Sequence, residues 1–243
     1  MACQATCRTG AACMAQYWRI PLRTHLISDK DDIAEVVARY VAGVAEPGDA
    51  VAVCESAVAI SQGRAVVSRS VRASWLARFL CRFPQKHGSL ATPQAMQLAI
   101  DEVGGPRIIA AAVAGGLGKM VGVRGLFYRV AGGGIAAIDD IAGTLYPFDE
   151  HIVLSPKDPE AIVGAIRERS RLEACIVDVN DLGCVDFLAA TEGIDKEAVS
   201  RALADNPAGN DDEQTPVVLL KRRIARYLDG STAPTRRSNR DSP

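Results

Sequence analysis

This sequence has no strong net charge, no long apolar run and no paired-cysteine motif. Its 28 basic and 29 acidic residues leave a formal net charge of −1, so nothing points to a nucleic-acid or anionic-membrane surface. No apolar run approaches the roughly 20 residues that span a bilayer. The longest, Ile108 to Val113, is expected inside a domain. We therefore expect neither nucleic-acid nor membrane partners.

The seven cysteines do not form a recognisable framework. Their odd number and the lack of any CxxC pair argue against a disulfide scaffold and a zinc ribbon. Cys3, Cys7 and Cys13 fall in a small, polar segment without a nearby histidine, which disfavours a metal site there. No apolar core of a secretory signal follows Arg8. A reducing cytoplasm is the expected location.

What the chain does contain is an alternation of short apolar runs and amphipathic stretches. Hydrophobic residues make up 48% of 243 residues, enough for one sizeable domain, which we place at 17–229. Residues 1–16 and 230–243 have too few large apolar side chains to repay the entropy of ordering, and we expect both segments to be disordered.

Periodicity and turn residues predict the individual elements. Helices are predicted from a Ser28 cap to before Pro47, at 72–83, from a Thr92 cap with Pro93 to Val103, from an Asp158 cap with Pro159 to about Arg171, from an Asp195 cap to Leu203, and at 221–228. Strands are predicted at 17–26, with Pro21 suiting an edge, and at 50–54, 65–67, 107–113, 125–131, 151–154, 174–177 and 217–220, with 146–148 extended.

Acidic and amide side chains crowd the end of one buried strand. The apolar run from Ala174 to Val177 is followed by Asp178, Asn180 and Asp181. Carboxylate and amide oxygens are the ligands that hold Mg²⁺ or Mn²⁺ near a phosphate. The alternative is a plain turn, because Asn, Asp and Gly are the usual turn residues. A second acidic pair, Asp139-Asp140, follows another short apolar run.

A glycine stretch at 115–119 invites comparison with a P-loop and fails it twice. Val113 stands where the first glycine belongs, and Met120 stands where the magnesium-binding Ser or Thr belongs. A glycine turn at Gly116 with Lys119 beside it remains a candidate phosphate contact, next to the alternative of a plain loop.

Nucleophilic catalysis finds little support. Cys54 or Ser56 after the buried strand could act as a nucleophile, but none of the three histidines, His25, His87 and His151, is placed to serve as its base. Glu55 fits equally well as a site residue and as a solvated strand end.

In order and spacing, several stretches resemble the coenzyme F420-0:L-glutamate ligases, the γ-glutamyl ligases of deazaflavin coenzyme biosynthesis, and above all a divergent bacterial branch of them. The resemblance covers about Ile20 to Arg223. It rests on Pro21-Leu22, Pro47-Gly48-Asp49, Gln62 to Val66, Ala137-Ile138-Asp139, Leu154 to Pro159, Val177 to Gly183, Asn206 to Gly209 and Glu213 to Pro216.

This resemblance implies an α+β fold of mixed β-sheets with flanking helices, and a homodimer paired through those sheets. It also implies a cytoplasmic acid–amino acid ligase that uses GTP or ATP with Mg²⁺ or Mn²⁺, and joins a small carboxylic acid to an amine such as glutamate through an acyl phosphate. Asp139 matches the acid of the family's Gly-Ile-Asp motif, and Asp178 matches the acid after its second buried strand. With Asn180 or Asp181 assisting, these acids are the expected metal ligands.

The chain also departs from the family pattern. The family's Lys-x-x-Ser-Lys motif is replaced at Ser56, Ala59 and Ile60, and the arginine of its Ser-Asp-Thr-x-Gly-Arg motif is missing. Lys119, Arg124 and Arg64 are the candidate replacements for these cations, and Gly116 is the candidate backbone contact to the nucleotide. A non-catalytic member that binds a nucleotide or another protein is the alternative function.

Overall fold

A computed structural model describes residues 16–83, 90–123, 125–136, 138, 146–179, 183–209 and 213–223. Its main sheet has five strands in the order β1-β7-β2-β5-β6. The strands are β1 (Gln16–Leu22), β2 (Ala50–Cys54), β5 (Glu173–Val179), β6 (Val185–Ala190) and β7 (Val217–Arg223). β2 and β5 pair in parallel, whereas the other neighbours are antiparallel. The sheet is therefore mixed, as expected, and Pro21 lies in an edge strand.

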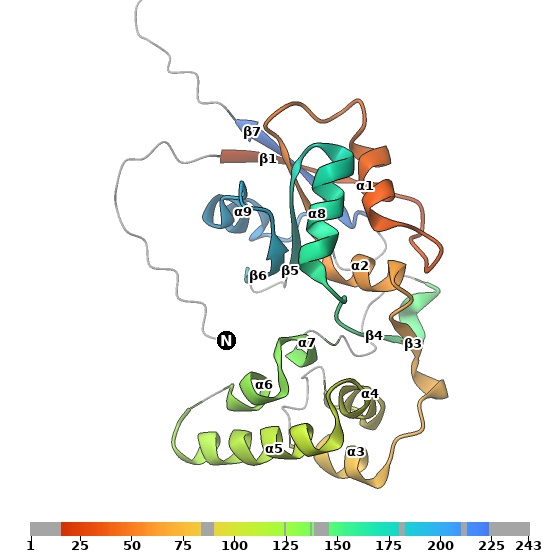
Figure 1. Ribbon diagram of the computed structural model, residues 1–243, viewed down its shortest axis with the longest axis vertical. Helices are drawn as coiled ribbons and strands as arrows, with labels where there is room; N and C mark the ends of the chain where they lie inside the picture. Colours follow the sequence, from red (N-terminus) through yellow and green to blue (C-terminus); the bar gives the residue numbers. More distant parts are fainter. Residues whose placement is uncertain are drawn as a thin grey trace, which may run out of the picture.

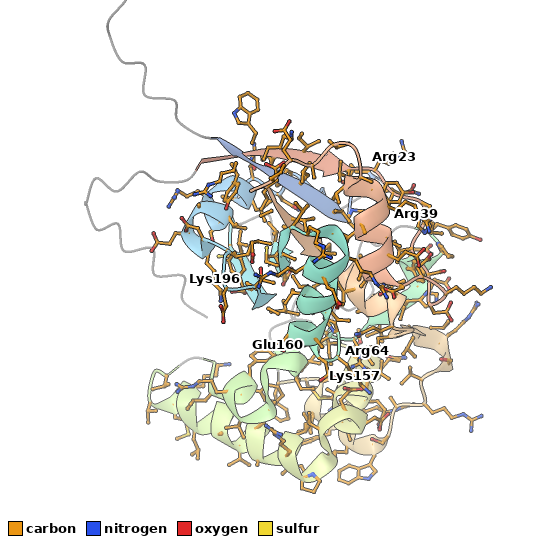
Figure 2. All side chains as sticks on the ribbon, turned by 45° about the horizontal axis from the view of Figure 1, so that its top comes forward. Arg23, Arg39, Arg64, Lys157, Glu160 and Lys196 are labelled. Atoms are coloured by element: carbon orange, nitrogen blue, oxygen red, sulfur yellow. The ribbon has the colours of Figure 1, made fainter. Side chains whose placement is uncertain are left out.

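A second lobe is built of helices (Figure 1). It contains α3 (Trp75–Leu80), α4 (Pro93–Val103), α5 (Gly105–Met120), α6 (Leu126–Ala131) and α7 (Gly133–Ala136). We call residues 75–136 the helical lobe, and the main sheet with its helices the sheet lobe. A two-stranded antiparallel sheet of β3 (Ala65–Val67) and β4 (His151–Val153), with the 3-10 turns η1 (Ser68–Ser70) and η2 (Phe148–Glu150), connects the lobes. Figure 2 shows Arg64 and Lys157 at this junction.

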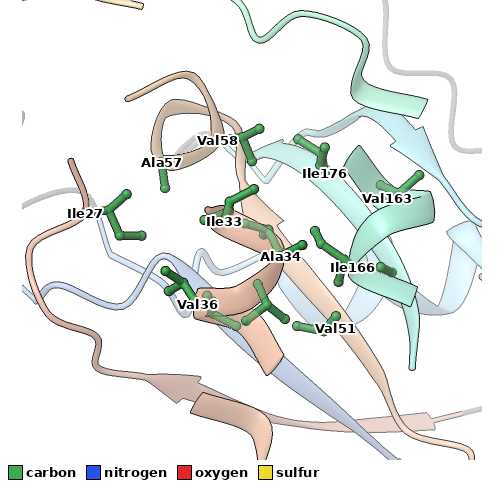
Figure 3. Close-up of a cluster of buried hydrophobic side chains, with 14 of the residues drawn as sticks. Ile27, Ile33, Ala34, Val36, Val51, Ala57, Val58, Val163, Ile166 and Ile176 are labelled. Atoms are coloured by element: carbon green, nitrogen blue, oxygen red, sulfur yellow. The ribbon is translucent and has the colours of Figure 1, made fainter. Parts of the chain in front are cut away.

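Alternation along the strands gives the sheet lobe two apolar layers. Val51, Val53 and Ile176 face α1 (Ile33–Val41), α2 (Glu55–Ser61) and α8 (Pro159–Ser170) in one core cluster (Figure 3). Ala50, Ala52 and Cys175 lie in the other cluster, with α9 (Lys196–Leu203). The sheet is thus covered on both faces. A separate cluster, which includes Met96 and Ile108, forms the core of the helical lobe.

Several local signals operate as predicted. The Thr92 hydroxyl accepts a hydrogen bond from the Ala95 amide at 3.2 Å, with Pro93 in the first turn, and Asp195 caps α9 through the Ala198 amide at 3.0 Å. Gly104 ends α4 with φ +87°, a conformation that favours glycine. The predicted strands at 50–54, 65–67 and 151–154 and within 173–179 are confirmed.

Two predicted strands are wrong. Residues 107–113 lie in helix α5, and residues 126–131 form helix α6 with Gly125 as its N-cap. A short apolar run does not distinguish a strand from a buried helix, and the alanines at 110–112 favour the helix. Strand β6 was not predicted, residues 221–223 continue β7 instead of starting a helix, and residues 146–148 form a turn instead of an extended segment.

Two predicted caps are also wrong. Asp32, not Ser28, caps α1, because its side chain accepts from the amides of Ala34 and Glu35. Ser28 and Asp31 do bond to each other, but they close the turn before the helix. Asp158 precedes α8 with φ +48° and makes no capping hydrogen bond. Of the predicted terminal segments, residues 1–15 and 230–243 lie outside the described residues, whereas Gln16 is the first residue of β1. In the part of the chain that the structure describes, no helix has both the length and the apolarity to cross a bilayer.

Candidate active site

The register of the main sheet brings several chain segments to one edge. Strands β1, β2 and β5 run in the same direction, so Leu22, Cys54 and Val179 end at the same side, which we call the carboxyl edge. Because β6 and β7 run the opposite way, the segments before them, 183–184 and 213–216, also lie there. In sheets of this kind, ligands bind outside the carboxyl ends of parallel strands.

Backbone contacts join these segments to one another. The Thr24 amide donates to the Gln214 carbonyl at 2.9 Å, and the Cys54 amide donates to the Pro216 carbonyl at 2.8 Å. The Thr215 hydroxyl donates to the Ala208 carbonyl. The loop after β1, the end of β2 and the segment before β7 are therefore held together. Described parts of four stretches that carry the family resemblance, at 21–22, 177–179 with 183, 206–209 and 213–216, lie at or beside this edge.

Two carboxylates lie opposite each other at the carboxyl edge. Asp178 of β5 pairs in register with Asp186 of β6, and both residues are exposed. Side chains of directly opposed residues share a sheet face at about 5 Å between Cβ atoms. Glu55, at the start of α2, is buried with 6% exposure. The carboxylates of Asp178 and Asp186 carry like charges that repel each other at the spacing of opposed residues, and a bound cation relieves that repulsion.

The structure describes only part of the predicted metal set. Asp178 lies at the carboxyl edge, whereas Asp139, Asn180 and Asp181 lie outside the described residues. Among the residues that are described, no group of three or more His, Cys, Asp and Glu side chains is arranged to hold a metal ion. Carboxylate oxygens are nevertheless the donors that Mg²⁺ and Mn²⁺ prefer. The metal site therefore stays a prediction, with Asp186 as an additional donor.

The predicted nucleotide contacts Gly116 and Lys119 lie in the helical lobe. Both belong to α5, so the predicted glycine turn at 115–119 is wrong. Gly118 is buried, and a Cβ there would lie 2.7 Å from the Val123 carbonyl oxygen, which explains the glycine by packing. Figure 1 shows α5 on the side of its lobe away from the main sheet. The structure does not bring Gly116 or Lys119 to the carboxyl edge, and Arg124 lies outside the described residues.

Arg64 has a structural position between the lobes. Its side chain is 10% exposed, its Nε donates to the Ser155 carbonyl, and its Nη2 lies 2.9 Å from Glu102 of α4. The guanidinium is thus already bound. Ala59 and Ile60, which replace the serine and the second lysine of the family's Lys-x-x-Ser-Lys motif, are buried in the core of the sheet lobe.

Lys157 is a cation that sequence reasoning did not select. Its backbone is held by the Gln62 side chain through hydrogen bonds of 2.9 and 2.8 Å. The helix that follows, α8, leads directly into β5 and packs antiparallel to it, so its start lies toward the carboxyl edge. Figure 2 shows Lys157 near Glu160 and Arg64 at the lobe junction. Its place within the family-like stretch 154–159 was the signal that could have identified it.

The ring of His25 is engaged by other groups and is not available as a base for Cys54 or Ser56. His25 has both ring nitrogens engaged, Nδ1 with the Tyr40 hydroxyl at 3.1 Å and Nε2 with Asp31 at 3.0 Å. Partial burial raises the pKa of Asp31, but hydrogen bonds from His25 and Ser28 outweigh it and hold the pKa below its ordinary value. This network organises the loop after β1, and His87 lies outside the described residues.

The fold and the edge together define a class: an α+β protein with paired carboxylates and a cation-bearing junction at the carboxyl ends of parallel strands. The family model described as F420-0:gamma-glutamyl ligase matches residues 21–204. The chain therefore belongs to the F420-0:gamma-glutamyl ligase family, which supports a γ-glutamyl ligase-like function with small-molecule substrates such as glutamate. A comparison with curated proteins returns no match.

Proposed function

We propose that this protein is a nucleotide- and divalent-metal-dependent ligase that joins a carboxylic acid to an amine. The γ-phosphoryl group of GTP or ATP passes to a carboxylate oxygen, which gives an acyl phosphate and releases the nucleoside diphosphate. The amine nitrogen then attacks the acyl carbon, an amide bond forms, and phosphate leaves with the loss of a proton from nitrogen. Family membership over residues 21–204 is the observation that carries this proposal.

In this proposal the carboxylates of the carboxyl edge hold the metal. Asp178 and Asp186 are opposed across β5 and β6, and Asp139, Asn180 and Asp181 complete the predicted donor set. A divalent ion in such a site neutralises charge on the transferring phosphoryl group. The positions of the Asp178 and Asp186 carboxylates are fixed, because both side chains extend from paired strands of a packed sheet instead of a free loop.

Lys157 is the proposed cation for the nucleotide phosphates. It is exposed, its backbone position is fixed by Gln62, and it precedes a helix that starts toward the carboxyl edge. Arg64 is excluded from this role by its bonds to Glu102 and Ser155. Lys119 and Arg124 remain predicted contacts, but the position of α5 favours Lys157 over Lys119.

Thermal unfolding with Mn²⁺ and GTP or ATP tests the site. Saturating ligand at a hundred times its Kd stabilises a protein by about 2.7 kcal/mol, which for a domain of this size raises Tm by roughly 5 to 10 °C. We expect Asp178→Asn, Asp139→Asn and Lys157→Ala to lose most of this shift while retaining the parent Tm without ligand.

Two variants serve as controls. Glu192→Gln changes an exposed acid in the turn after β6, at the opposite edge of the sheet, and Arg39→Ala removes an exposed cation from the last turn of α1. Both should keep the full shift. Retention of the parent shift by Asp178→Asn and Asp139→Asn together would place the metal site elsewhere and leave 180–181 as a turn.

The alternative function, a non-catalytic nucleotide- or protein-binding member, has one observation in its favour. Ile60, with 9% exposure, stands at the second lysine of the family's Lys-x-x-Ser-Lys motif, and Ala59, with 0% exposure, stands at its serine. A turnover assay for nucleoside diphosphate release, run over a panel of acids and amines including glutamate, separates the two. Nucleotide binding without turnover over the whole panel would favour the alternative.

A further inference from the structure

The helical lobe exposes two rows of large apolar side chains. Trp75, Phe79 and Phe83 recur every four residues along α3 and the turn after it, and they are 79%, 51% and 63% exposed. We call these three residues the α3 row. The α5 row follows spacings of four, four and three residues along one side of its helix, and it consists of Ile109, Val113, Leu117 and Met120, which are 45%, 58%, 59% and 84% exposed.

The two helices that carry these rows lie at the same end of the lobe. Leu76 of α3 packs on the start of α5, because a Cβ placed on Gly105 would lie 3.8 Å from the Leu76 Cδ2. Buried residues of both helices belong to the core cluster that also holds Met96 of α4, so the exposed rows lie on the outer sides. Figure 1 shows α3 and α5 at the end of the helical lobe that is away from the main sheet.

The helical lobe is also strongly basic, although the chain as a whole is not. Residues 75–136 contain seven Lys and Arg but only two Asp and Glu, which gives a formal charge of +5, so the rest of the chain carries −6. The two acids are neighbours at the end of α4, where Glu102 pairs with Arg64 at the lobe junction. The net charge of −1, from which no anionic partner surface is expected, does not record this separation of charge between the lobes.

Exposed cations adjoin both apolar rows. Arg78 and Arg82 directly precede the two phenylalanines of the α3 row, and Arg107 and Lys119 lie near the two ends of α5. In the part of the chain that the structure describes, none of these four cations forms an ion pair with a carboxylate. Long basic side chains can lay their stems on apolar surface while their charges reach an anionic one. The surface therefore combines apolar contact area with positive charge.

A lipid bilayer fits this combination better than a protein partner does. A protein interface carries about one hydrogen bond per 100–200 Å², but residues 108–118 contain no polar side chain that could form one. Acyl chains require no hydrogen bonds. Interfacial helices present Trp, Phe and Leu to the acyl boundary and Lys and Arg to the anionic headgroups, and the α3 row with its arginines has this composition.

We propose that the helical lobe docks on an anionic lipid bilayer. The α3 row and the α5 row enter the boundary between headgroups and acyl chains, and the neighbouring cations bind the lipid phosphates. Apolar burial and electrostatic attraction add in binding of this kind. The lobe lies on the bilayer, since no helix of the described residues is long and apolar enough to cross it. Docking through this end leaves the carboxyl edge of the main sheet open, and it does not depend on ligase activity.

Flotation of the full chain with lipid vesicles is the primary test. We expect binding to phosphatidylcholine vesicles that contain about a third phosphatidylglycerol, weak binding to pure phosphatidylcholine, and weaker binding to the anionic vesicles as salt is raised. Arg78→Ser with Arg82→Ser should weaken binding to the anionic vesicles roughly tenfold or more, because each cation near such a surface contributes about a factor of five. Arg39→Ser with Arg201→Ser, which removes the same charge from exposed positions of the sheet lobe, is the matched control and should bind within about twofold of the parent.

The two tryptophans report which lobe enters the lipid. Trp75 in the α3 row and Trp18 in β1 are both exposed, at 79% and 63%. In the Trp18→Phe variant, the fluorescence of Trp75 should shift to the blue on anionic vesicles and be quenched by lipids with brominated acyl chains. In the Trp75→Phe variant, Trp18 should show neither effect. Phe79→Ser with Leu117→Ser, one change in each row, should weaken binding on the order of a hundredfold.

Three outcomes overturn the proposal. One is a parent that floats with neither kind of vesicle. Another is vesicle binding that leaves Trp75 unquenched, or that the sheet-lobe control loses as far as Arg78→Ser with Arg82→Ser does. The third is a parent that does not bind vesicles but binds polyglutamate through these two arginines, which would assign the surface to an acidic protein partner.

Discussion

Replacement of Arg64 by methionine should weaken the connection between the two lobes. The change keeps an apolar stem but removes the guanidinium that donates to the Ser155 carbonyl and pairs with Glu102 of α4. The Arg64 side chain is only 10% exposed, whereas that of Glu102 is 33% exposed. Water therefore solvates the carboxylate that is left behind, but reaches the site of the guanidinium poorly.

The exposed fractions of the two side chains set the limits of the free energy of unfolding that Arg64→Met is expected to lose. Breaking a fully buried ion pair costs about 3 to 5 kcal/mol, and a surface pair is worth about 1 kcal/mol or less. A buried carbonyl that loses its donor adds about 1 to 3 kcal/mol. We expect Arg64→Met to lower the free energy of unfolding by about 2 to 3 kcal/mol. Glu102→Gln, whose amide oxygen still accepts, should lower it by about 1 kcal/mol.

The two tryptophans make a direct assay possible. Trp18 lies in β1 of the sheet lobe and Trp75 lies in α3 of the helical lobe. A Trp75→Phe background therefore reports the sheet lobe through Trp18, and a Trp18→Phe background reports the helical lobe through Trp75. Urea unfolding followed by fluorescence should show coincident transitions in the parent. In Arg64→Met the helical-lobe transition should move to lower urea than that of the sheet lobe.

The control for Arg64→Met is the same substitution at an exposed arginine. Arg39→Met removes an exposed i, i+4 pair with Glu35 at 3.3 Å and should cost no more than about 0.5 kcal/mol. If Arg64→Met changes stability as little as Arg39→Met does, and both tryptophans still report a single transition, then the pair between Arg64 and Glu102 does not couple the lobes.

Three further predictions concern stability and reactivity. The hydrogen bond from Arg169 holds the pKa of Asp32 below its ordinary value although partial burial raises it. A lowered carboxyl pKa stabilises the fold at pH values above the ordinary pKa of about 3.9. Asp32→Asn keeps the cap but should therefore be less stable than the parent near neutral pH. Urea titrations should show this difference in stability vanishing as the pH falls below about 3.9. Burial raises the pKa of Cys175 to about 12, so peptide mapping should find it unalkylated at pH 8 until the protein is unfolded, and rapid labelling in the native state would contradict its position. Leu219→Ala, in the fully buried centre of β7, should cost about 2 to 5 kcal/mol in urea unfolding, with Leu26→Ala, at an exposed position, as the control; equal losses would refute the assigned core.

Features that depend on neighbouring residues were predictable from the sequence. The Thr92-Pro93 start of α4, the Asp195 cap of α9 and the Gly104 stop require only the residues beside them, because capping bonds and left-handed turns are local. The same holds for the strand at 50–54 and for Asp178 at the end of β5. The roles of Arg64 and Lys157 could not be predicted in this way, because their partners are distant in the chain. Arg64 was predicted to contact phosphate but pairs with Glu102, 38 residues away. Lys157 was not selected, and it is held by Gln62, 95 residues away.

The tertiary structure decided what local pattern left ambiguous. The run from Ile108 to Val113 is apolar enough for a buried strand or a helix, and its packing on α6 and α4 makes it a helix with one exposed apolar side. The carboxyl edge depends on strand order in the same way. Asp178 meets Asp186, and Thr24 meets Gln214, only because β7 enters the sheet between β1 and β2 and β6 pairs on the outside of β5. Strand order is set by the burial of both sheet faces, which no short stretch of the sequence records.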